Sequence, residues 1–238
     1  MSISNSISRF TAYYTRHGFR ATIRRAGVAL KRGLLASRMV LFYCDLGKQT
    51  TAPVNIPSSL KAERLRSHAE LSPQDLQEMT SFWNPKQAHK NIRERFEQGA
   101  SLWLIKSGDK LAGYGWTLQG RTIEPHYFPL AQDDVHLFDF YVFPEYRGRG
   151  INPFLVNHIL RSLGSKCAGR AFIEAAEWNE AQLSSLRKTA FRPVGWARKS
   201  AIFHRTLVCW AQKDAVEGVQ KVAQRSERAS NIVRSQGR

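Results

Sequence analysis

A glycine-containing junction, residues 142–155, carries the strongest chemical signal in the sequence. It joins an apolar run to a stretch with helical spacing, and two arginines alternate with two glycines just before that stretch: Arg147, Gly148, Arg149 and Gly150. Glycine lets a backbone turn sharply and approach a ligand, and the first amides of a helix carry the positive end of its dipole. The junction therefore predicts a site for a phosphate or pyrophosphate group.

Two other families of phosphate-binding loops do not fit this junction. It contains no GKS or GKT sequence, which a nucleoside-triphosphate loop requires, and its glycines do not follow the GxGxxG pattern of dinucleotide-binding folds. It also lies far from the first strand of the chain, where the dinucleotide pattern belongs.

The junction resembles instead the cofactor loop of the GNAT acyltransferases, in which a strand and a proline precede the pattern RxxGxG or RxxGxA. Pro144 and Arg147–Asn152 follow that pattern, with Asn152 in place of the final Gly or Ala. Asn179 also precedes Phe191 by the twelve residues that the family often shows. The resemblance implies an α/β (α+β) fold: a mixed, mostly antiparallel sheet with a splayed parallel strand pair and helices on both faces.

The resemblance also implies acetyl-CoA, or another acyl-CoA, as co-substrate and no metal. On this likeness, strand residues pair with the pantetheine arm, the loop amides hold the pyrophosphate, and two later polar residues lie beside the arm and thiol. The expected contacts are Phe140, Tyr141, Val142, Arg147, Gly148, Arg149, Gly150, Ile151, Asn152, Asn179 and Ser185. Leu186 stands where many members carry a Tyr that protonates the departing thiolate, so the usual acid is absent.

Asp139 is the predicted proton acceptor, because it is the one carboxylate inside an apolar strand, where burial would raise its pKa. The alternative is that Asp139 only pairs with an arginine or caps backbone groups. Strict alternation would turn His136 to the other face, as a core residue. Four residues are candidates for acceptor binding: Glu124, His126, Tyr127 and Trp178. Cys167 lies in a predicted loop with no base nearby, so thiol chemistry is not expected.

The function that these residues predict is transfer of an acetyl group from acetyl-CoA to an amine, by direct attack in a ternary complex. A small amine or an amino sugar of the cell envelope is the favoured acceptor. Two alternatives remain open. The domain could bind acyl-CoA as an inactive sensor, since the usual acid is missing, or the basic ends could bind nucleic acid, whose affinity would fall steeply with salt.

The elements that position these residues follow one another without a long linker. Two helices are predicted over 72–83 and 85–98, then a hairpin of strands 101–106 and 111–118. A loop over 121–132 precedes a central apolar strand at 135–143. The remaining predicted elements are a helix at 149–163, a strand at 171–175, a helix at 179–188 and a strand or hairpin within 192–210. A strand, crossover helix and strand in that order imply a parallel pair.

Composition supports one globular core with basic extensions. The 238 residues carry 36 Lys and Arg against 19 Asp and Glu, a net charge of +17, with 42% hydrophobic residues. We expect a basic amphipathic extension over 1–47 with a possible first strand, a catalytic domain over 48–210 and a basic flexible tail over 211–238. Three cysteines without a CxxC pair do not indicate disulfides or zinc.

The first 38 residues contain eight arginines and lysines and no acidic residue. The segment fits a helix docked on the core, an anchor to anionic membrane through residues 16–38, or a mitochondrial presequence. No apolar run is long enough to span a bilayer. A cytoplasmic protein, in peripheral contact with the inner face of the membrane, is the expected location.

Overall fold

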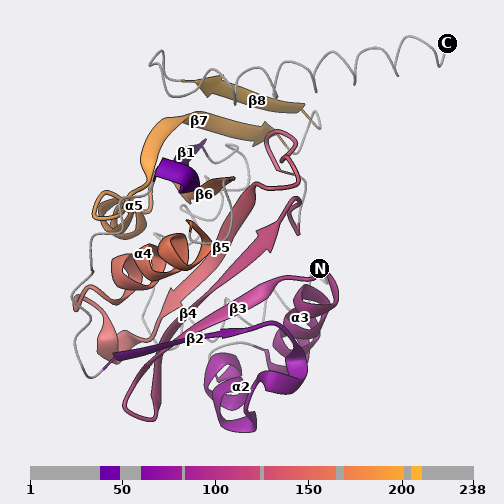
Figure 1. Ribbon diagram of the computed structural model, residues 1–238, viewed down its shortest axis with the longest axis vertical. Coiled ribbons are helices and arrows are strands. Elements are labelled where there is room, and N and C mark those ends of the chain that lie inside the picture. The colour runs from indigo at the N-terminus through magenta and orange to yellow at the C-terminus, as the bar shows by residue number, and fades with distance from the viewer. Residues whose placement is uncertain are drawn as a thin grey trace, which may run out of the picture.

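The computed structural model describes residues 38–48, 60–81, 84–123, 126–164, 169–200 and 205–210. Within them, eight strands form one sheet in the order β2-β3-β4-β5-β6-β1-β7-β8 (Figure 1). The strands are β1 (Arg38–Asp45), β2 (Leu60–Leu65), β3 (Ser101–Ser107), β4 (Lys110–Gln119), β5 (Val135–Val142), β6 (Arg170–Ala176), β7 (Arg192–Ser200) and β8 (Arg205–Trp210). The α-helices are α2 (Pro73–Thr80), α3 (Pro85–Glu97), α4 (Ile151–Gly164) and α5 (Glu180–Leu186). Among the described strands, β5 and β6 alone pair in parallel, which confirms the predicted mixed sheet.

Capping residues begin α2 and α3 where the sequence signals predict. Ser72 Oγ accepts a hydrogen bond from the Asp75 amide at 3.1 Å, and Asn84 Oδ1 accepts one from the Gln87 amide at 3.3 Å. Each cap satisfies an amide that has no partner inside its own helix. Gly99 follows α3 with a φ of 80°, the conformation that ends a helix at glycine. Both predicted helices are confirmed over the described residues.

The predicted strands are confirmed too, and the structure adds two facts about the early chain. β3 and β4 form the expected hairpin, with Gly108 at a φ of 61° in its turn. β1 lies inside the sheet, between β6 and β7, and is antiparallel to both. β2, which the sequence patterns did not predict, pairs with β3 at the edge of the sheet and alternates between half-buried and exposed residues at its start.

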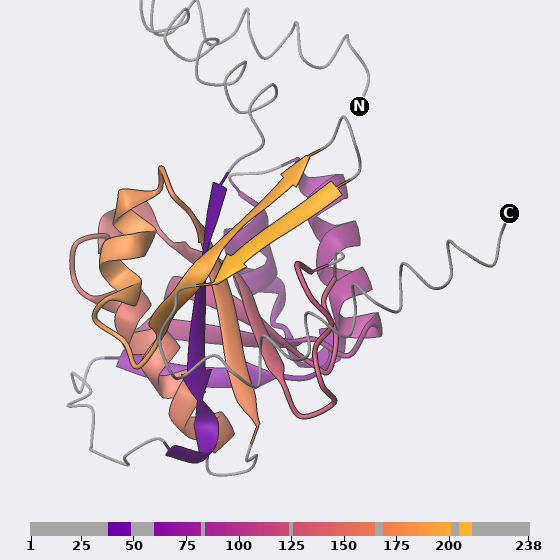
Figure 2. The same cartoon turned by 90° about the horizontal axis from the view of Figure 1, so that it is seen from above.

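Helices cover both faces of the sheet, as predicted. α4 packs on one face, where Leu155 and Ile159 are buried against β3, β5 and β6. α3 packs on the other face, where Ile92 and Phe96 meet the inner residues of β3 and β4. Figure 2 shows the strands between α4 and α5 on one side and α3 on the other. Burial in the α4 core raises the pKa of the Cys44 thiol to about 12, so this thiol is not a nucleophile at neutral pH.

β5 and β6 separate soon after they meet, and this opening positions the site. They pair only at Val135 with Ala171 and at His136 with Phe172. Further along β5 a bulge interrupts the ladder to β4, at the shift of register between Tyr114 and Trp116, and Asp139 adopts a φ of 50° there. The extra residue of a bulge shifts the alternation of side chains along the strand.

The bulge corrects two expectations about Asp139. Its carboxylate pairs with Arg95 of α3, and the Arg95 guanidinium lies 5.5 Å from the centre of the Phe138 ring, on which His136 stacks. Asp139 and His136 therefore lie on the same face of the sheet, although strict alternation predicts opposite faces. The Asp139 side chain is 43% exposed, so the expected burial of this carboxylate is also wrong.

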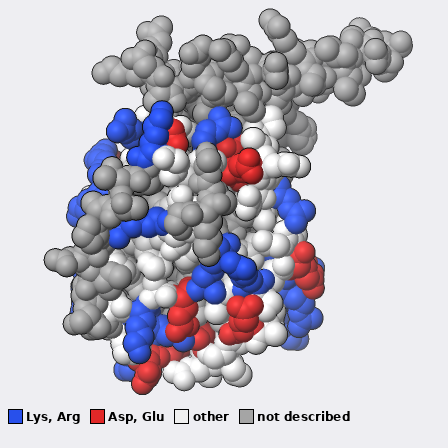
Figure 3. All heavy atoms as spheres, in the orientation of Figure 1, with Lys and Arg blue, Asp and Glu red and all other residues white. Residues whose placement is uncertain are grey.

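The face of the molecule in Figure 3 carries both signs of charge over the described residues. On the face shown in Figure 3, blue Lys and Arg side chains alternate with red Asp and Glu side chains, without one continuous basic stripe over the described residues. Within the same residues, no helix is long and apolar enough to cross a membrane. The predicted basic helix within residues 16–38, apart from Arg38, and the predicted tail over 211–238 lie outside the described part of the chain.

Candidate active site

A cavity of about 480 Å³ lies between the outer half of β5, the loop after it, the start of α4 and the length of α5. Ten of the eleven residues predicted to contact acyl-CoA line it: Phe140, Tyr141, Val142, Arg147, Gly148, Gly150, Ile151, Asn152, Asn179 and Ser185. The eleventh, Arg149, is not part of the lining, and its guanidinium lies over the Tyr146 ring at 5.8 Å. The sequence thus brings together strand, loop and helix residues that are up to 45 positions apart.

The glycine loop is shaped to leave room for a ligand. Gly148 and Gly150 have φ angles of 77° and 74°, and a Cβ atom at either position would meet nothing within 4 Å. Glycine is required here by backbone conformation and not by crowding. Arg147 Nε donates to the Val142 carbonyl at 3.1 Å, which holds the arginine along the cavity wall. The first turn of α4 follows directly, so its free amides and the arginine charge act on the same space.

Asn152 connects the two helices that border the cavity. Its Nδ2 donates to Ser185 Oγ at 2.9 Å. Its Oδ1 is buried and has no hydrogen-bond partner among the described residues. A buried acceptor without a donor costs free energy, so this oxygen fits a ligand that supplies an N–H or O–H group. The amide-bearing arm of acyl-CoA is such a ligand, and Asn152 is the residue at which the loop departs from the RxxGxG pattern.

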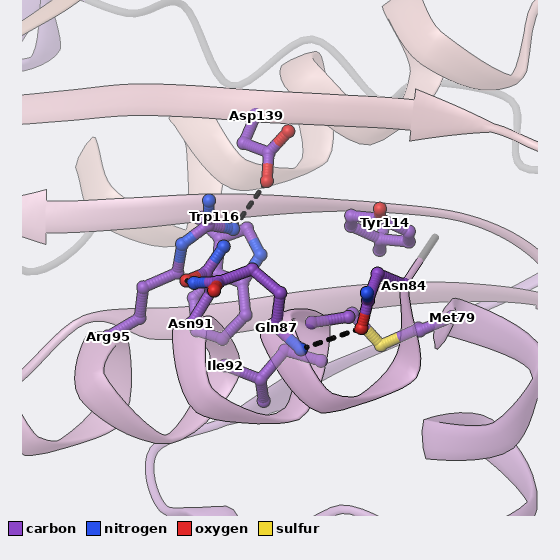
Figure 4. A pocket seen from close by; sticks show the side chains of 10 residues that line it. Met79, Asn84, Gln87, Asn91, Ile92, Arg95, Tyr114, Trp116 and Asp139 are labelled. Atoms are coloured by element: carbon purple, nitrogen blue, oxygen red, sulfur yellow. Dashed lines mark hydrogen bonds and ion pairs between the residues drawn. The ribbon is translucent and has the colours of Figure 1, made fainter. Parts of the chain in front are cut away.

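A second cavity, of about 270 Å³, lies on the other face of the sheet beneath α3 (Figure 4). Its lining consists of Met79, Asn84, Gln87, Ala88, Asn91, Ile92, Arg95, Tyr114, Trp116 and Asp139. The polar residues of α3 lie along one stripe of the helix, because they are spaced three or four residues apart. Gln87 Nε2 donates to Asn91 Oδ1 at 2.7 Å within this stripe.

Aromatic rings and one ion pair complete the second cavity. Arg95 bonds to the Asp139 carboxylate and lies over the Trp116 ring, 5.2 Å from its centre. Trp116 is fully buried, and its Nε1 donor has no hydrogen-bond partner in the described part of the chain. Asp139 and Arg95 are the charged side chains of the lining, and they neutralise each other. The cavity is therefore polar without net charge and has an unused donor for an oxygen atom.

Comparison with known families identifies the family of the chain. A family model described as the acetyltransferase (GNAT) family matches residues 64–191, which is more than half of the chain. The chain belongs to this family. An N-acetyltransferase activity that uses acetyl-CoA follows for the family in general, and the GNAT resemblance of the loop after β5 is confirmed.

Solved structures of similar shape include other GNAT proteins. An acetyltransferase of this family from Colwellia psychrerythraea has 11% identity and a TM-score of 0.49 over 66% of this chain and 53% of that one. A GCN5-related N-acetyltransferase from Kribbella flavida has 12% identity and a TM-score of 0.44, over 81% and 65% of the two chains. The present chain thus spans less than two thirds of the length of either of these two proteins. No curated protein matches its sequence.

Of the four residues predicted to bind the acceptor, none lines the second cavity. Glu124 lies outside the described residues. His126 and Tyr127 belong to a loop that packs on β5 and β6, where the His126 ring lies 4.9 Å from that of His136. Trp178 is 54% exposed at the end of β6. The four predicted residues belong to a loop and to the end of a strand, whereas most of the residues that line the second cavity belong to α3 and β4.

The α3 residues of the second cavity were missed because nothing in their types marks them as functional. Asn and Gln on a helix usually face solvent. The one available signal is their spacing, since Asn84, Gln87 and Asn91 continue to Arg95 on a single helical stripe. That stripe becomes informative only when Trp116 and Asp139 are placed opposite it by the sheet. His136 and Glu174, whose side chains bond at 2.9 Å, form a further polar pair on this face of the GNAT domain.

Gly115 links the shape of β4 to the 480 Å³ cavity and gives a first prediction. A Cβ at this position would lie 2.4 Å from the Phe140 ring, and Phe140 lines the cavity. Gly115→Ala should push that ring toward the ligand space and weaken acetyl-CoA binding about tenfold, since such overpacking typically costs 1–3 kcal/mol. Calorimetry measures the change.

A double variant separates this effect from general damage to the sheet. If Gly115→Ala acts through the Phe140 ring, then Gly115→Ala combined with Phe140→Leu should bind acetyl-CoA as well as Phe140→Leu alone. Additive losses would mean that the alanine disturbs the strand pairing instead, and unchanged binding in the single variant would contradict the placement of Phe140 at the ligand.

Proposed function

We propose that the protein is an acyl-CoA-dependent N-acyltransferase that moves an acetyl group from acetyl-CoA to an amine by direct attack in a ternary complex. One observation carries the proposal: the bulged strand β5 contributes to both cavities. Phe140–Val142 line the 480 Å³ cavity, and Asp139 lines the 270 Å³ cavity on the opposite face. Because β5 and β6 diverge between them, a thioester held in the first cavity can meet an amine held in the second.

The chain supplies three kinds of contact for acetyl-CoA. Arg147 and the free amides at the start of α4 bind the pyrophosphate, since both present positive charge to the cavity. The Asn152 Oδ1 acceptor and the Asn179 side chain bind the polar groups of the pantetheine arm. β5 offers backbone groups near Phe140. When bound, acetyl-CoA supplies the activated acyl group, and the residues of the chain orient it.

For the acceptor we propose an amino sugar or a similar neutral, hydroxyl-bearing amine of the kind found in cell-envelope precursors. The support comes from the second cavity. Asn84, Gln87 and Asn91 provide amide donors and acceptors, Tyr114 and Trp116 provide aromatic surface, and the buried Trp116 Nε1 needs an oxygen partner. Amides that surround an aromatic surface can bind hydroxyl groups and the apolar face of a sugar ring at the same time.

Asp139 has a place in this proposal as the residue that accepts a proton from the nitrogen after the N–C bond has formed and before the C–S bond breaks to leave the amide and the thiolate. It lies at the side of the second cavity formed by β5, and Arg95 holds its carboxylate. General base catalysis requires an acceptor within hydrogen-bond reach of the proton that leaves. Cytoplasmic location and membrane contact through residues 16–38 remain predictions, because that segment lies outside the described residues apart from Arg38.

Two measurements test the proposed function. Calorimetric titration with acetyl-CoA should show micromolar binding. A thiol-release assay with acetyl-CoA and D-glucosamine should show turnover, with the N-acetyl product identified by mass spectrometry. Binding without turnover for any of a panel of amino sugars and small amines would support the alternative of an acyl-CoA sensor. Absence of binding would contradict the assignment of the 480 Å³ cavity.

A further inference from the structure

Three polar side chains from separate segments of the chain meet where β5 and β6 begin to separate. His126 belongs to the loop before β5, His136 is the β5 member of the last parallel pair, opposite Phe172, and Glu174 lies two residues further along β6. One nitrogen of each histidine and one Glu174 oxygen lie within 4.8 Å of one another. These residues line neither the 480 Å³ cavity nor the 270 Å³ cavity, so they form a cluster of their own.

The distances within this cluster suit a single metal ion. His136 Nε2 lies 2.9 Å from Glu174 Oε2, and the centres of the His126 and His136 rings are 4.9 Å apart. In a tetrahedral zinc site, bonds of about 2.0–2.2 Å place neighbouring ligand atoms about 3.4 Å from each other. The 2.9 Å separation and the 4.8 Å limit lie on either side of that value. Small side-chain rotations therefore bring the three atoms to ligand distance of one ion.

The types of the three side chains select the class of ion. Imidazole nitrogen and carboxylate oxygen are both common ligands of zinc, and two histidines with one glutamate are a known zinc-binding set. Magnesium and calcium prefer oxygen ligands throughout, so a set with two nitrogens is unfavourable for them. The cluster therefore favours zinc, or another divalent ion of the first transition row, over magnesium.

The hydrogen bonding of His136 gives an independent reason to expect a cation. Its side chain is 7% exposed, and its Nδ1 is buried with no hydrogen-bond partner among the described residues. When Nε2 donates to the Glu174 carboxylate, Nδ1 keeps a lone pair, and a buried lone pair without a donor costs free energy. A metal ion can use this lone pair while the carboxylate fixes the ring, an arrangement that is common around zinc-bound histidines.

Aromatic rings flank the cluster, and its carboxylate reaches the surface. His136 stacks on Phe138 with ring centres 5.4 Å apart, and the His126 ring meets the Phe128 ring edge to face at 4.8 Å. The Glu174 side chain is 21% exposed, which provides an entry path for an ion. An apolar shell limits access of water and strengthens the attraction between an ion and its ligands.

We propose that His126, His136 and Glu174 form a binding site for a divalent transition metal of the zinc class. The two imidazoles bind the ion, and the Glu174 carboxylate supplies negative charge, as a third ligand or as the group that fixes the His136 ring. Because these residues come from the loop before β5 and from both strands, the ion joins the three segments where the strands separate. Its role is to stabilise this part of the sheet, and the site is independent of the proposed function.

Calorimetric titration of the full chain with ZnCl₂, after treatment with a chelator and its removal, tests the site. We expect one Zn²⁺ per chain with a micromolar or lower Kd. At a free zinc concentration about 100 times the Kd, the Tm should rise by about 5–10 °C, because the ion binds the folded chain. Mg²⁺ at the same concentration should leave the Tm unchanged. Absence of stoichiometric zinc binding, or an equal response to Mg²⁺, would overturn the proposal.

Two cluster variants and a histidine control locate the bound ion. His126→Gln should weaken zinc binding about 100-fold or more, since it removes a ligand, and Glu174→Gln should weaken it about tenfold or more. His158→Gln removes a half-buried histidine of α4, on the opposite face of the sheet, and should bind zinc as the parent does. Zinc that both cluster variants bind with the affinity of the parent must lie elsewhere, which contradicts the proposed site.

Co²⁺ gives a second readout on the unaltered chain, which keeps the test decisive if a variant fails to fold. Four-coordinate Co²⁺ absorbs visible light far more strongly than six-coordinate Co²⁺, so the spectrum reports the geometry of the site. We expect strong absorption that saturates at one Co²⁺ per chain and disappears when zinc is added. Weak absorption without saturation would count against the site.

Titration with acetyl-CoA separates this proposal from the proposed function. The three cluster residues are absent from the lining of the 480 Å³ cavity, so the zinc-loaded and zinc-free chains should bind acetyl-CoA with the same affinity. A chain that binds acetyl-CoA but no zinc refutes the metal site alone. A chain that binds zinc but no acetyl-CoA supports the metal site and refutes the proposed function.

Discussion

Arg147→Glu should weaken acetyl-CoA binding by about 100-fold or more, the largest effect on affinity that the structure leads us to expect. Arg147 lines the cavity beside the free amides of α4, and its Nε is already held by the Val142 carbonyl. The substitution removes a charge-assisted contact to phosphate, worth about 1.5–3 kcal/mol, and adds repulsion between like charges. Calorimetric titration with acetyl-CoA measures the loss.

Arg149→Glu is the matched control for this prediction. It changes the charge by the same amount two residues away, but Arg149 is not part of the cavity lining and its guanidinium lies over Tyr146. We expect less than a fivefold change in affinity. If both variants lose affinity equally, the effect is one of overall charge and the cavity assignment has no support from Arg147.

Glycine substitutions test the same loop by a different physical route. Gly150 and Gly108 both adopt positive φ angles, 74° and 61°, with open space where a Cβ would lie. Alanine should therefore strain either turn by about 1 kcal/mol. Gly150→Ala should also reduce acetyl-CoA affinity, because it disturbs the amides at the ligand. Gly108→Ala, in the distant β3–β4 turn, should lower stability alone.

Asp139→Asn should reduce kcat by about 100-fold or more while leaving acetyl-CoA affinity unchanged, because general base catalysis contributes about 10²–10⁴ in rate. Asparagine keeps the shape of the side chain and loses the ability to accept the proton. Asp139 lines the 270 Å³ cavity and is absent from the 480 Å³ cavity to which we assign acetyl-CoA, so the affinity for acetyl-CoA should not change. Steady-state kinetics and calorimetry on the same variant provide both numbers.

The pH dependence of the variant tests the step in which Asp139 acts. The loss of kcat in Asp139→Asn should persist at high pH. The proton that Asp139 accepts leaves the nitrogen after attack, whatever the charge of the incoming amine. Asp109→Asn, at an exposed position of the β3–β4 turn, controls for the change of charge. Full activity in Asp139→Asn would remove this residue from the mechanism and leave its ion pair with Arg95 as a structural contact.

Most of the elements could be predicted from local signals, because these depend on neighbouring residues. Ser72 and Gly99 act on the amides and carbonyls of their own helices, and Gly108 acts on its own turn. The glycine loop could be predicted for the same reason: its arginines, glycines and following helix are contiguous. β2 was missed because an edge strand with alternating charged and apolar residues has a weak pattern.

The cavity beneath α3 could not be predicted, because it depends on contacts between distant segments. The bulge at Asp139 changes which face a residue occupies, and no residue type near it signals an extra position in the ladder. Asn84 and Gln87 become functional candidates only when Trp116 is placed across from them. The bond between Glu174 and His136 likewise depends on the parallel pairing of β5 with β6.

The sequence by itself therefore determined the family, the glycine loop after β5 and the order of helices and strands, since each is encoded in short runs of residues with defined spacing. The tertiary structure alone decided that Asp139 is exposed beside Arg95, that α3 and β4 enclose a second cavity without net charge, and that His136 and Glu174 meet where β5 and β6 separate. These three features depend on strand register and on one added residue in β5. Both bring together residues that are far apart in the sequence, so a local sequence pattern does not predict them.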